Sequence, residues 1–310
     1  MMTDSSGSEF RSGFVCLIGR PNTGKSTLTN ALVGEKVAIT SSRPQTTRHT
    51  IRGIVHREDF QIVLVDTPGL HRPRTLLGKR LNDLVRDTYS DVDVIVLCIP
   101  VDEAIGPGDR WIYEQIRDVA PRTTLVVAVT KIDKVPKDRV AAQLMAVNEL
   151  VGEHAAAIVP VSATTGEQVE VLIGVLVDQL KPGPAFYPDG ELTDEPEETL
   201  MAEFIREAAL EGVRDEMPHS LAVVIDEVSP REGRSEEQGE LIDVRAILYV
   251  ERDSQKGIVI GKGGARLKKV GSNARRQIER LLGTKVYLEL RVKVAKNWQQ
   301  DPKLLGRLGF

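Results

Sequence analysis

Apolar and polar positions up to Leu180 predict strands and helices in alternation. Short apolar runs bounded by turn residues, as in strands, occur at residues 14–18, 51–56, 60–65, 92–99, 124–129 and 156–161. Helical spacing of apolar residues occurs at residues 24–33, after Pro107, and at 139–151 and 168–180. The second and third strands flank Arg57-Glu58-Asp59 and predict a hairpin. The alternation predicts an α/β fold with a doubly wound sheet, which binds ligands at the carboxyl ends of its strands.

The pattern changes after Lys181-Pro182-Gly183-Pro184, which ends the last of these helices. The order helix, strand, strand, helix, helix, strand is then predicted at residues 198–212, 221–228, 241–250, 256–282 (two helices) and 285–294. A chain of 310 residues is expected to divide, since single cores rarely grow past ~250 residues. We therefore predict a disordered tail at 1–12, an α/β domain at 13–181, an acidic linker at 182–198 and a smaller α+β domain at 199–310 with a C-terminal tail.

Composition predicts a cellular location and reveals an uneven distribution of charge along the chain. Two cysteines, both in apolar runs, are too few for a disulfide framework, and the polar N-terminus lacks the apolar core of a signal peptide. No apolar run is long enough for a membrane span, so a cytoplasmic location is expected. The net charge of −4 conceals 18 acidic and 4 basic residues at 186–243, followed by 13 basic and 3 acidic residues at 252–296. The basic segment is suited to a polyanionic partner.

A phosphate-binding loop is predicted between the first strand and the first helix. Residues 19–26 read G-x-x-x-x-G-K-S, with the strand before and the helix after that this motif requires. Lys25 is expected to reach the β- and γ-phosphates of a nucleoside triphosphate, and the Ser26 hydroxyl to ligate Mg²⁺. The predicted nucleotide-binding residues of this loop are Gly19, Arg20, Pro21, Asn22, Thr23, Gly24, Lys25, Ser26 and Thr27.

Further candidate residues follow two of the predicted strands. Asp66-Thr67-Pro68-Gly69 would hold Mg²⁺ through Asp66 and meet the γ-phosphate through the Gly69 amide. In Thr130-Lys131-Ile132-Asp133, the Asp133 carboxylate can accept both N–H groups of a guanine edge, whereas adenine offers no such pair. Lys131 would lie along the base plane. These residues predict GTP as the nucleotide.

Two weaker signals complete the predicted site. Ser162 and Ala163 follow another strand, where a backbone N–H would contact guanine O6. The long segment at 36–50 is interpreted as a switch that becomes ordered when a threonine hydroxyl joins Mg²⁺. Thr47 is the expected ligand and Thr46 the alternative.

These motifs together resemble a translation-factor-class GTPase domain, and Gly-Arg-Pro-Asn with Thr-Thr-Arg-His resembles its Era branch. The resemblance implies hydrolysis of GTP to GDP, with Mg²⁺ at Ser26, Thr47 and Asp66, and a catalytic contribution from Lys25, Asn22 and Gly69. Relatives hold K⁺ with an asparagine that matches Asn22, although an asparagine there can equally serve turn geometry.

Two positions depart from the patterns of known GTPases. Thr130 replaces the usual asparagine of the guanine motif, so we expect weaker guanine affinity, with the hydroxyl still able to donate to guanine N7. Leu70 stands where Ras-like proteins place a water-orienting glutamine, although an apolar residue is typical of the Era branch.

The basic half contains Gly261-Lys262-Gly263-Gly264, a G-x-x-G loop between two predicted helices. This loop and the element order resemble a KH domain, which clamps single-stranded RNA with such a loop. Residues 13–181 would then be the GTPase domain and 199–310 the KH-type domain. The predicted RNA-binding residues are Ile260, Gly261, Lys262, Gly263, Gly264, Arg266, Lys268 and Lys269. Trp298, beyond the last strand, is interpreted as a hydrophobic anchor of the tail.

The resemblance covers nearly the whole chain. It implies a GTP-controlled monomer that binds the 3′ end of 16S ribosomal RNA, not DNA, and assists assembly of the small ribosomal subunit and rRNA processing. It also implies peripheral contact with the inner face of the cell membrane. The alternative is a membrane or signalling switch whose basic half binds anionic lipid. The G-x-x-G loop favours RNA, because lipid binding needs only diffuse charge and exposed apolar groups.

Overall fold

The computed structural model describes residues 9–40, 50–70, 75–89, 91–211, 220–233 and 239–308. Their contacts form two compact units. The first unit contains most of the chain up to Asp194. The second runs from Glu195 onward and includes the short described segments 39–40 and 75–80.

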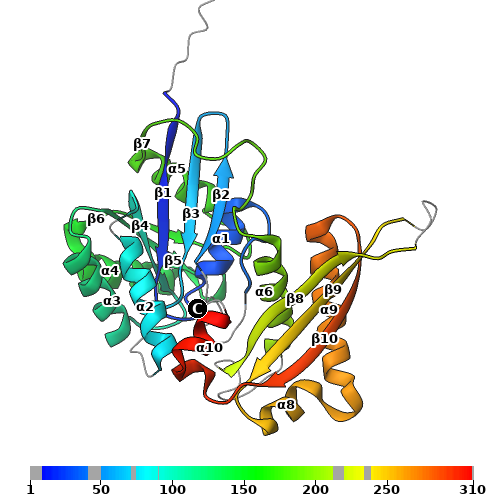
Figure 1. The fold of residues 1–310 in the computed structure, drawn as a ribbon. Helices are drawn as coiled ribbons and strands as arrows, with labels where there is room; N and C mark the ends of the chain where they lie inside the picture. The colour runs from blue at the N-terminus through cyan, green and yellow to red at the C-terminus, as the bar shows by residue number, and fades with distance from the viewer. Residues whose placement is uncertain are drawn as a thin grey trace, which may run out of the picture. The chain divides into compact units, whose positions relative to one another are not determined.

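A seven-stranded sheet forms the centre of the first unit (Figure 1). Its strands are β1 (Arg11–Ile18), β2 (Ile51–His56), β3 (Phe60–Asp66), β4 (Val94–Pro100), β5 (Thr124–Thr130), β6 (Ala155–Val161) and β7 (Lys181–Pro182). The order is β2-β3-β1-β4-β5-β6, with β7 pairing with β1. The pairs β2–β3 and β1–β7 are antiparallel and the other pairs are parallel. The predicted hairpin is thereby confirmed, and the parallel strands end at a common edge.

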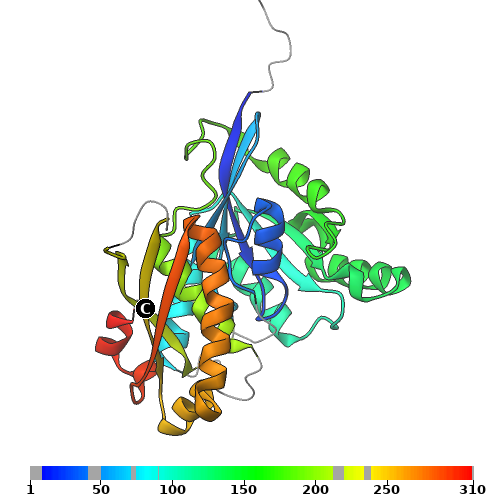
Figure 2. The same cartoon turned by 90° about the vertical axis from the view of Figure 1, so that its right-hand side faces the viewer.

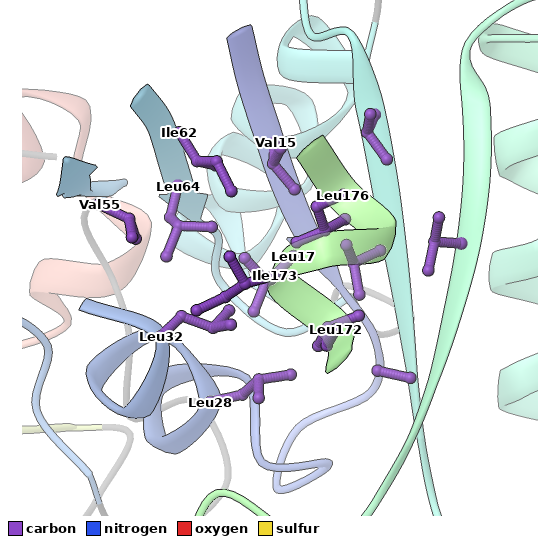
Figure 3. Packing of buried hydrophobic residues seen from close by; sticks show 14 of the residues in the cluster. Val15, Leu17, Leu28, Leu32, Val55, Ile62, Leu64, Leu172, Ile173 and Leu176 are labelled. Atoms are coloured by element: carbon purple, nitrogen blue, oxygen red, sulfur yellow. The ribbon is translucent and has the colours of Figure 1, made fainter. Parts of the chain in front are cut away.

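Helices cover both faces of this sheet and bury two apolar clusters. They are α1 (Lys25–Val33), α2 (Leu76–Tyr89), α3 (Pro107–Val119), α4 (Lys137–Val151) and α5 (Val169–Gln179), with short 3₁₀ turns η1 (Ile132–Lys134) and η2 (Gly152–His154). Side chains of α1 and α5 pack with inward residues of β1 and β3 in one cluster (Figure 3). Side chains of α2, α3 and α4 pack in the other cluster. The doubly wound α/β fold is confirmed.

Helix α2 was not predicted, although its sequence carries a signal. Leu77, Leu81, Val85 and Tyr89 recur every four residues, and all four side chains are buried. This spacing places them along one side of a helix. The sequence prediction missed this helix although Thr75 caps its start, where Thr75 Oγ1 accepts a hydrogen bond from the Gly78 N–H (3.0 Å).

Residues 183–194, predicted as part of an acidic linker, form an ordered strap within the first unit. The buried side-chain amide of Gln61 donates to the carbonyl of Tyr187 (2.9 Å) and accepts from its N–H (3.0 Å). The Asp194 carboxylate accepts from the Tyr187 hydroxyl (2.7 Å) and from Arg52 (2.8 Å). Because buried amides are costly to leave unpaired, Gln61 fixes the strap on β3. The predicted domain boundaries stay predictions.

The second unit has the predicted order helix, strand, strand, helix, helix, strand (Figure 1). Its main elements are α6 (Glu197–Leu210), β8 (Ala222–Pro230), β9 (Leu241–Val250), α8 (Asp253–Ile260), η4 (Lys262–Gly264), α9 (Ala265–Leu282) and β10 (Lys285–Val294). The sheet order is β10-β9-β8, with β9 parallel to β10 and antiparallel to β8. Helix α9 lies beside β10 (Figure 2) and buries Val270, Ala274 and Ile278.

The C-terminal segment ends in η5 (Trp298–Gln300) and α10 (Pro302–Arg307), which were not predicted. The Trp298 side chain is fully buried, and its Nε1–H donates to the carbonyl of Ser220 (3.1 Å). The interpretation of Trp298 as an anchor is therefore confirmed. Within the described residues, no helix is both long and apolar enough to cross a membrane.

Candidate functional site

The predicted phosphate loop connects the end of β1 to the start of α1. A Cβ atom on Gly19 would lie 2.7 Å from the Cys98 carbonyl oxygen and 2.7 Å from Thr23 Oγ1, so only glycine fits there. Gly24 caps α1 with a φ of 93°, and Asn22 has a φ of 65°. Asparagine adopts this left-handed region more readily than most residues. The backbone at Asn22 therefore supports the turn-geometry interpretation without testing the K⁺ interpretation.

Lys25 lies folded over this loop. Its side chain is buried, and Nζ donates to the carbonyls of Gly19 (3.1 Å) and Arg20 (2.9 Å). Burial lowers the pKa of the Lys25 ammonium, while the nearby Asp66 carboxylate acts in the opposite direction. An ammonium held at the mouth of a glycine-rich loop is placed to bind phosphate oxygens.

The residues predicted to hold Mg²⁺ are only partly described. Asp66 is fully buried at the end of β3, and Ser26 lies half-buried in the first turn of α1. Thr47 and its alternative Thr46 lie outside the described residues. Where the structure is described, no group of three or more His, Cys, Asp or Glu side chains is placed to hold a metal. One carboxylate and one hydroxyl fit Mg²⁺, because this ion usually keeps waters and binds substrate phosphates.

Gly69 and Leu70 bring the end of β3 against the phosphate loop. A Cβ atom on Gly69 would lie 2.8 Å from the Pro21 nitrogen, and the Leu70 N–H donates to the Gly19 carbonyl (3.3 Å). The Leu70 side chain is 2% exposed and packs in the apolar cluster of α2, α3 and α4. Because this side chain is apolar and buried, it offers no group that could orient a water molecule.

The strand ends of β5 and β6 meet the start of α1 at a hollow of about 110 Å³. Its lining residues are Gly24, Thr27, Leu28, Thr130, Lys131, Asp133, Lys134, Val161, Ala163 and Thr164. Ser162 Oγ donates to Asp133 Oδ1 (2.6 Å) and accepts from the Thr165 N–H (3.2 Å). The second carboxylate oxygen of Asp133 is not engaged by Ser162. Residues far apart in sequence thus form one pocket that suits a planar base.

Thr130 and Lys131 have hydrogen-bond partners that the sequence did not indicate. Thr130 Oγ1 donates to the carbonyl of Thr23 (2.6 Å), which lies in the phosphate loop. The expected bond to guanine N7 would therefore require this bond to break. Lys131 Nζ binds the Asp102 carboxylate (3.2 Å), a partner that the sequence did not indicate.

The predicted nucleic-acid loop lies between α8 and α9. A Cβ atom on Gly261 (φ 73°) would lie 2.7 Å from Arg266 Cβ, so this position requires glycine. Gly263 and Gly264 also have positive φ, but no atom lies within 4 Å of a Cβ added at either position. Lys262 is exposed. The loop therefore presents glycine backbone and one lysine to solvent.

A groove of about 340 Å³ starts at this loop and runs between α9 and β10. It is lined by Gly264, Leu267, Lys268, Gly271, Ser272, Arg275, Tyr287, Leu288 and Leu290. Most of these residues were not predicted. On α9 they recur at every third or fourth position, a spacing that could have identified the helix face. The groove combines two cations with an apolar floor, as suits a stacked, charged polymer.

Four predicted residues near the loop differ in their surroundings. One amino group of Arg266 donates to the carbonyls of Ala209 (3.0 Å) and Glu211 (2.9 Å), which closes the end of α6. Ile260 is half-buried against the core, whereas Ile258 is exposed. Lys268 and Lys269 are exposed. The geometry thus gives Arg266 a helix-capping role, and its contact with RNA stays a prediction.

The two units define a class of protein. A strand, phosphate loop and helix with a base pocket at neighbouring strand ends form a P-loop GTPase domain, and the second unit has KH element order. Comparison with protein families agrees. Residues 14–131 match the family described as 50S ribosome-binding GTPase, and residues 216–299 match the family described as KH domain.

Individual relatives identify the family. GTPase Era of Mycobacterium sp. (strain JLS) is 84% identical over 98% of this chain and 100% of its own length. GTPase Era of Mycobacterium tuberculosis (strain ATCC 25177 / H37Ra) is 79% identical over 97% of this chain and 99% of its own. The chain therefore belongs to the Era family of GTPases.

Solved structures are also similar over almost the whole chain. One is Era in complex with MgGDPNP and nucleotides 1506–1542 of 16S ribosomal RNA, with a TM-score of 0.91 and 34% identity, covering 97% of this chain and 99% of that one. Another is a single-residue variant of Aquifex aeolicus Era bound to GDP·AlF₄⁻, with the same TM-score, identity and coverage.

Proposed function

We propose that this GTPase is a switch that binds the 3′ end of 16S ribosomal RNA and assists small-subunit assembly and rRNA processing. The observation that carries the proposal is the groove between α9 and β10, which begins at the G-x-x-G loop. Lys268 and Arg275 would neutralise RNA phosphates, while Leu288 and Leu290 form an apolar floor for bases. The similar Era bound to nucleotides 1506–1542 of 16S ribosomal RNA supports this choice of RNA.

In this proposal the first unit binds GTP and hydrolyses it to GDP. Lys25 holds the β- and γ-phosphates, while Asp133, oriented by Ser162, accepts the two N–H groups of guanine. Mg²⁺, held by Ser26, Asp66 and Thr47, would neutralise phosphate charge when bound. The Gly69 amide lies beside the phosphate loop, where it would detect the γ-phosphate. Leu70 contributes no side-chain catalyst, so backbone amides and Lys25 carry the electrostatic stabilisation.

Direct RNA binding tests the proposal. A labelled RNA with the sequence of the 16S 3′ end should bind the full chain with nucleotide-dependent affinity, measured by fluorescence anisotropy with a GTP analogue and with GDP. A shuffled RNA of equal composition should bind more weakly, and affinity should fall as salt rises, because phosphate contacts release counterions. Binding to anionic vesicles, measured in parallel, tests the alternative that the basic half binds lipid. Equal binding of both RNAs in both nucleotide states would contradict the proposal.

Asp133→Asn should shift base preference from guanine toward xanthine. The asparagine amide replaces one acceptor oxygen with a donor, which suits the xanthine 2-oxygen and opposes the guanine amino group. We expect GDP affinity to fall by about 100-fold, because an unsatisfied buried hydrogen-bonding group costs about 1–3 kcal/mol, and XDP affinity to rise. Competition against a fluorescent nucleotide measures both. Undiminished guanine preference would remove Asp133 from its assigned role.

The proposal also includes four finer points. The protein uses K⁺, contacts the membrane peripherally, is located in the cytoplasm and is a monomer. A K⁺ ion at Asn22 would add positive charge beside the phosphates, and equal turnover in KCl and NaCl would remove it.

A further inference from the structure

Thr130 lines the base pocket, and a short hydrogen bond holds its side-chain hydroxyl. It ends β5, its side chain is 4% exposed, and it lines the pocket that Asp133 and Ala163 share. Its Oγ1 lies 2.6 Å from the Thr23 carbonyl oxygen, a short and well-formed O–H···O bond. The bond joins the base-binding end of β5 to the middle of the phosphate loop.

The number of hydrogens decides what this hydroxyl can do. A threonine hydroxyl carries one hydrogen, and a backbone carbonyl only accepts, so the hydrogen of Thr130 is committed to Thr23. The N7 atom of a purine also only accepts. A side-chain amide at this position would carry two hydrogens and could serve a carbonyl and a ring nitrogen together. Thr130 can serve only one of them.

Two other hydroxyls close to Thr130 donate to partners of their own. Thr23 Oγ1 donates to the Arg20 carbonyl (3.0 Å), and Ser162 Oγ donates to Asp133 (2.6 Å). Lys131 Nζ is paired with Asp102 (3.2 Å). Neither hydroxyl could replace Thr130 at a purine N7 without breaking an existing bond, whereas the Lys131 ammonium carries three hydrogens and is held toward Asp102.

We propose that Thr130 is a positioning residue that ties the phosphate loop to the base pocket and has no hydrogen left to donate to purine N7. The inference rests on the proposed guanine-nucleotide site. Base selection then depends on Asp133 at the opposite edge of the purine. Nucleotide affinity should therefore not depend on N7, but it should depend on the hydroxyl of Thr130.

A protein-by-ligand cycle tests the proposal with GDP and 7-deaza-GDP, in which carbon replaces N7. The full-length wild type should bind both with equal affinity, measured by competition against a fluorescent nucleotide. Thr130→Asn should bind GDP about threefold to tenfold more tightly than wild type, the range of one added hydrogen bond, and should lose that gain with 7-deaza-GDP. The affinity gain of Thr130→Asn over wild type is compared between GDP and 7-deaza-GDP. The part of the gain that is lost with 7-deaza-GDP measures the N7 contact, because general effects of the substitution cancel.

Two further variants test the tether itself. Thr130→Val keeps the shape but removes the hydroxyl, and should weaken both ligands equally by about tenfold, because the Thr23 carbonyl loses its partner. Thr130→Ser keeps the hydroxyl and should stay near wild type. A melting temperature for each variant confirms folding.

The outcomes separate the inference from the function on which it rests. A wild type that binds GDP but loses threefold or more with 7-deaza-GDP, or a Thr130→Val variant with unchanged affinity, would overturn the inference alone. A wild type that binds ADP as well as GDP would overturn the guanine-nucleotide site and the inference with it.

Discussion

Lys25→Ala is expected to remove GTP binding and hydrolysis. Its ammonium is the buried cation of the phosphate loop, bonded to two loop carbonyls, and alanine removes the positive charge proposed to bind the phosphates. Loss of one partner from a buried, hydrogen-bonded charge pair costs about 3–5 kcal/mol, so affinity should fall by about 100-fold or more. Nucleotide affinity is measured by titration with a fluorescent GTP analogue, and hydrolysis by phosphate release.

The control for this variant is Lys137→Ala, since Lys137 is exposed in the first turn of α4. It removes the same charge and side chain from the same unit, and should leave nucleotide affinity unchanged. A melting temperature separates lost binding from lost folding. Lys25→Ala that melts like wild type and still binds GTP within tenfold would refute the role given to Lys25.

Sequence reasoning identified most of the first unit because its signals are local. The apolar runs of β4 and β5 are buried on both faces, and the phosphate loop is contiguous, so spacing and residue type were sufficient. Asp133 and Ala163 could be placed together because parallel strands end at one edge. The strap at 183–194 could not be predicted, since its order depends on Gln61, more than a hundred positions away in sequence.

The details that sequence reasoning did not foresee depend on side-chain partners. Arg266 carries the same charge as Lys268, yet its guanidinium closes the end of α6 while Lys268 lines the groove. The Thr130 hydroxyl is chemically able to donate to guanine N7, but it donates instead to the Thr23 carbonyl 2.6 Å away. Composition and spacing show which groups are present, whereas such competition is decided only by the folded geometry.

Lys262→Asp with Gly263→Asp should strongly weaken RNA binding while GTP hydrolysis survives. Lys262 is exposed, and a side chain at Gly263 meets no atom within 4 Å, so both carboxylates project from the loop. They would replace one cation with two anions where RNA phosphates are proposed to approach. Aspartate tolerates the left-handed φ of 57° at Gly263 better than most residues. Gly261 must stay, because its Cβ would strike Arg266.

The chain offers a matched control at the other end of α9. Gly283 has a φ of 66° with open space around it, and the exposed Lys285 lies two positions further on. Gly283→Asp with Lys285→Asp therefore adds the same charge with the same backbone demand, outside the groove. The loop variant should lose RNA affinity by about 100-fold at low salt, with a salt slope lower by about 1 if one phosphate contact is removed. The control should lose far less, since only long-range charge has changed. Equal losses in both variants would mean that the basic half attracts RNA by diffuse charge, and the G-x-x-G loop would lose its assigned role.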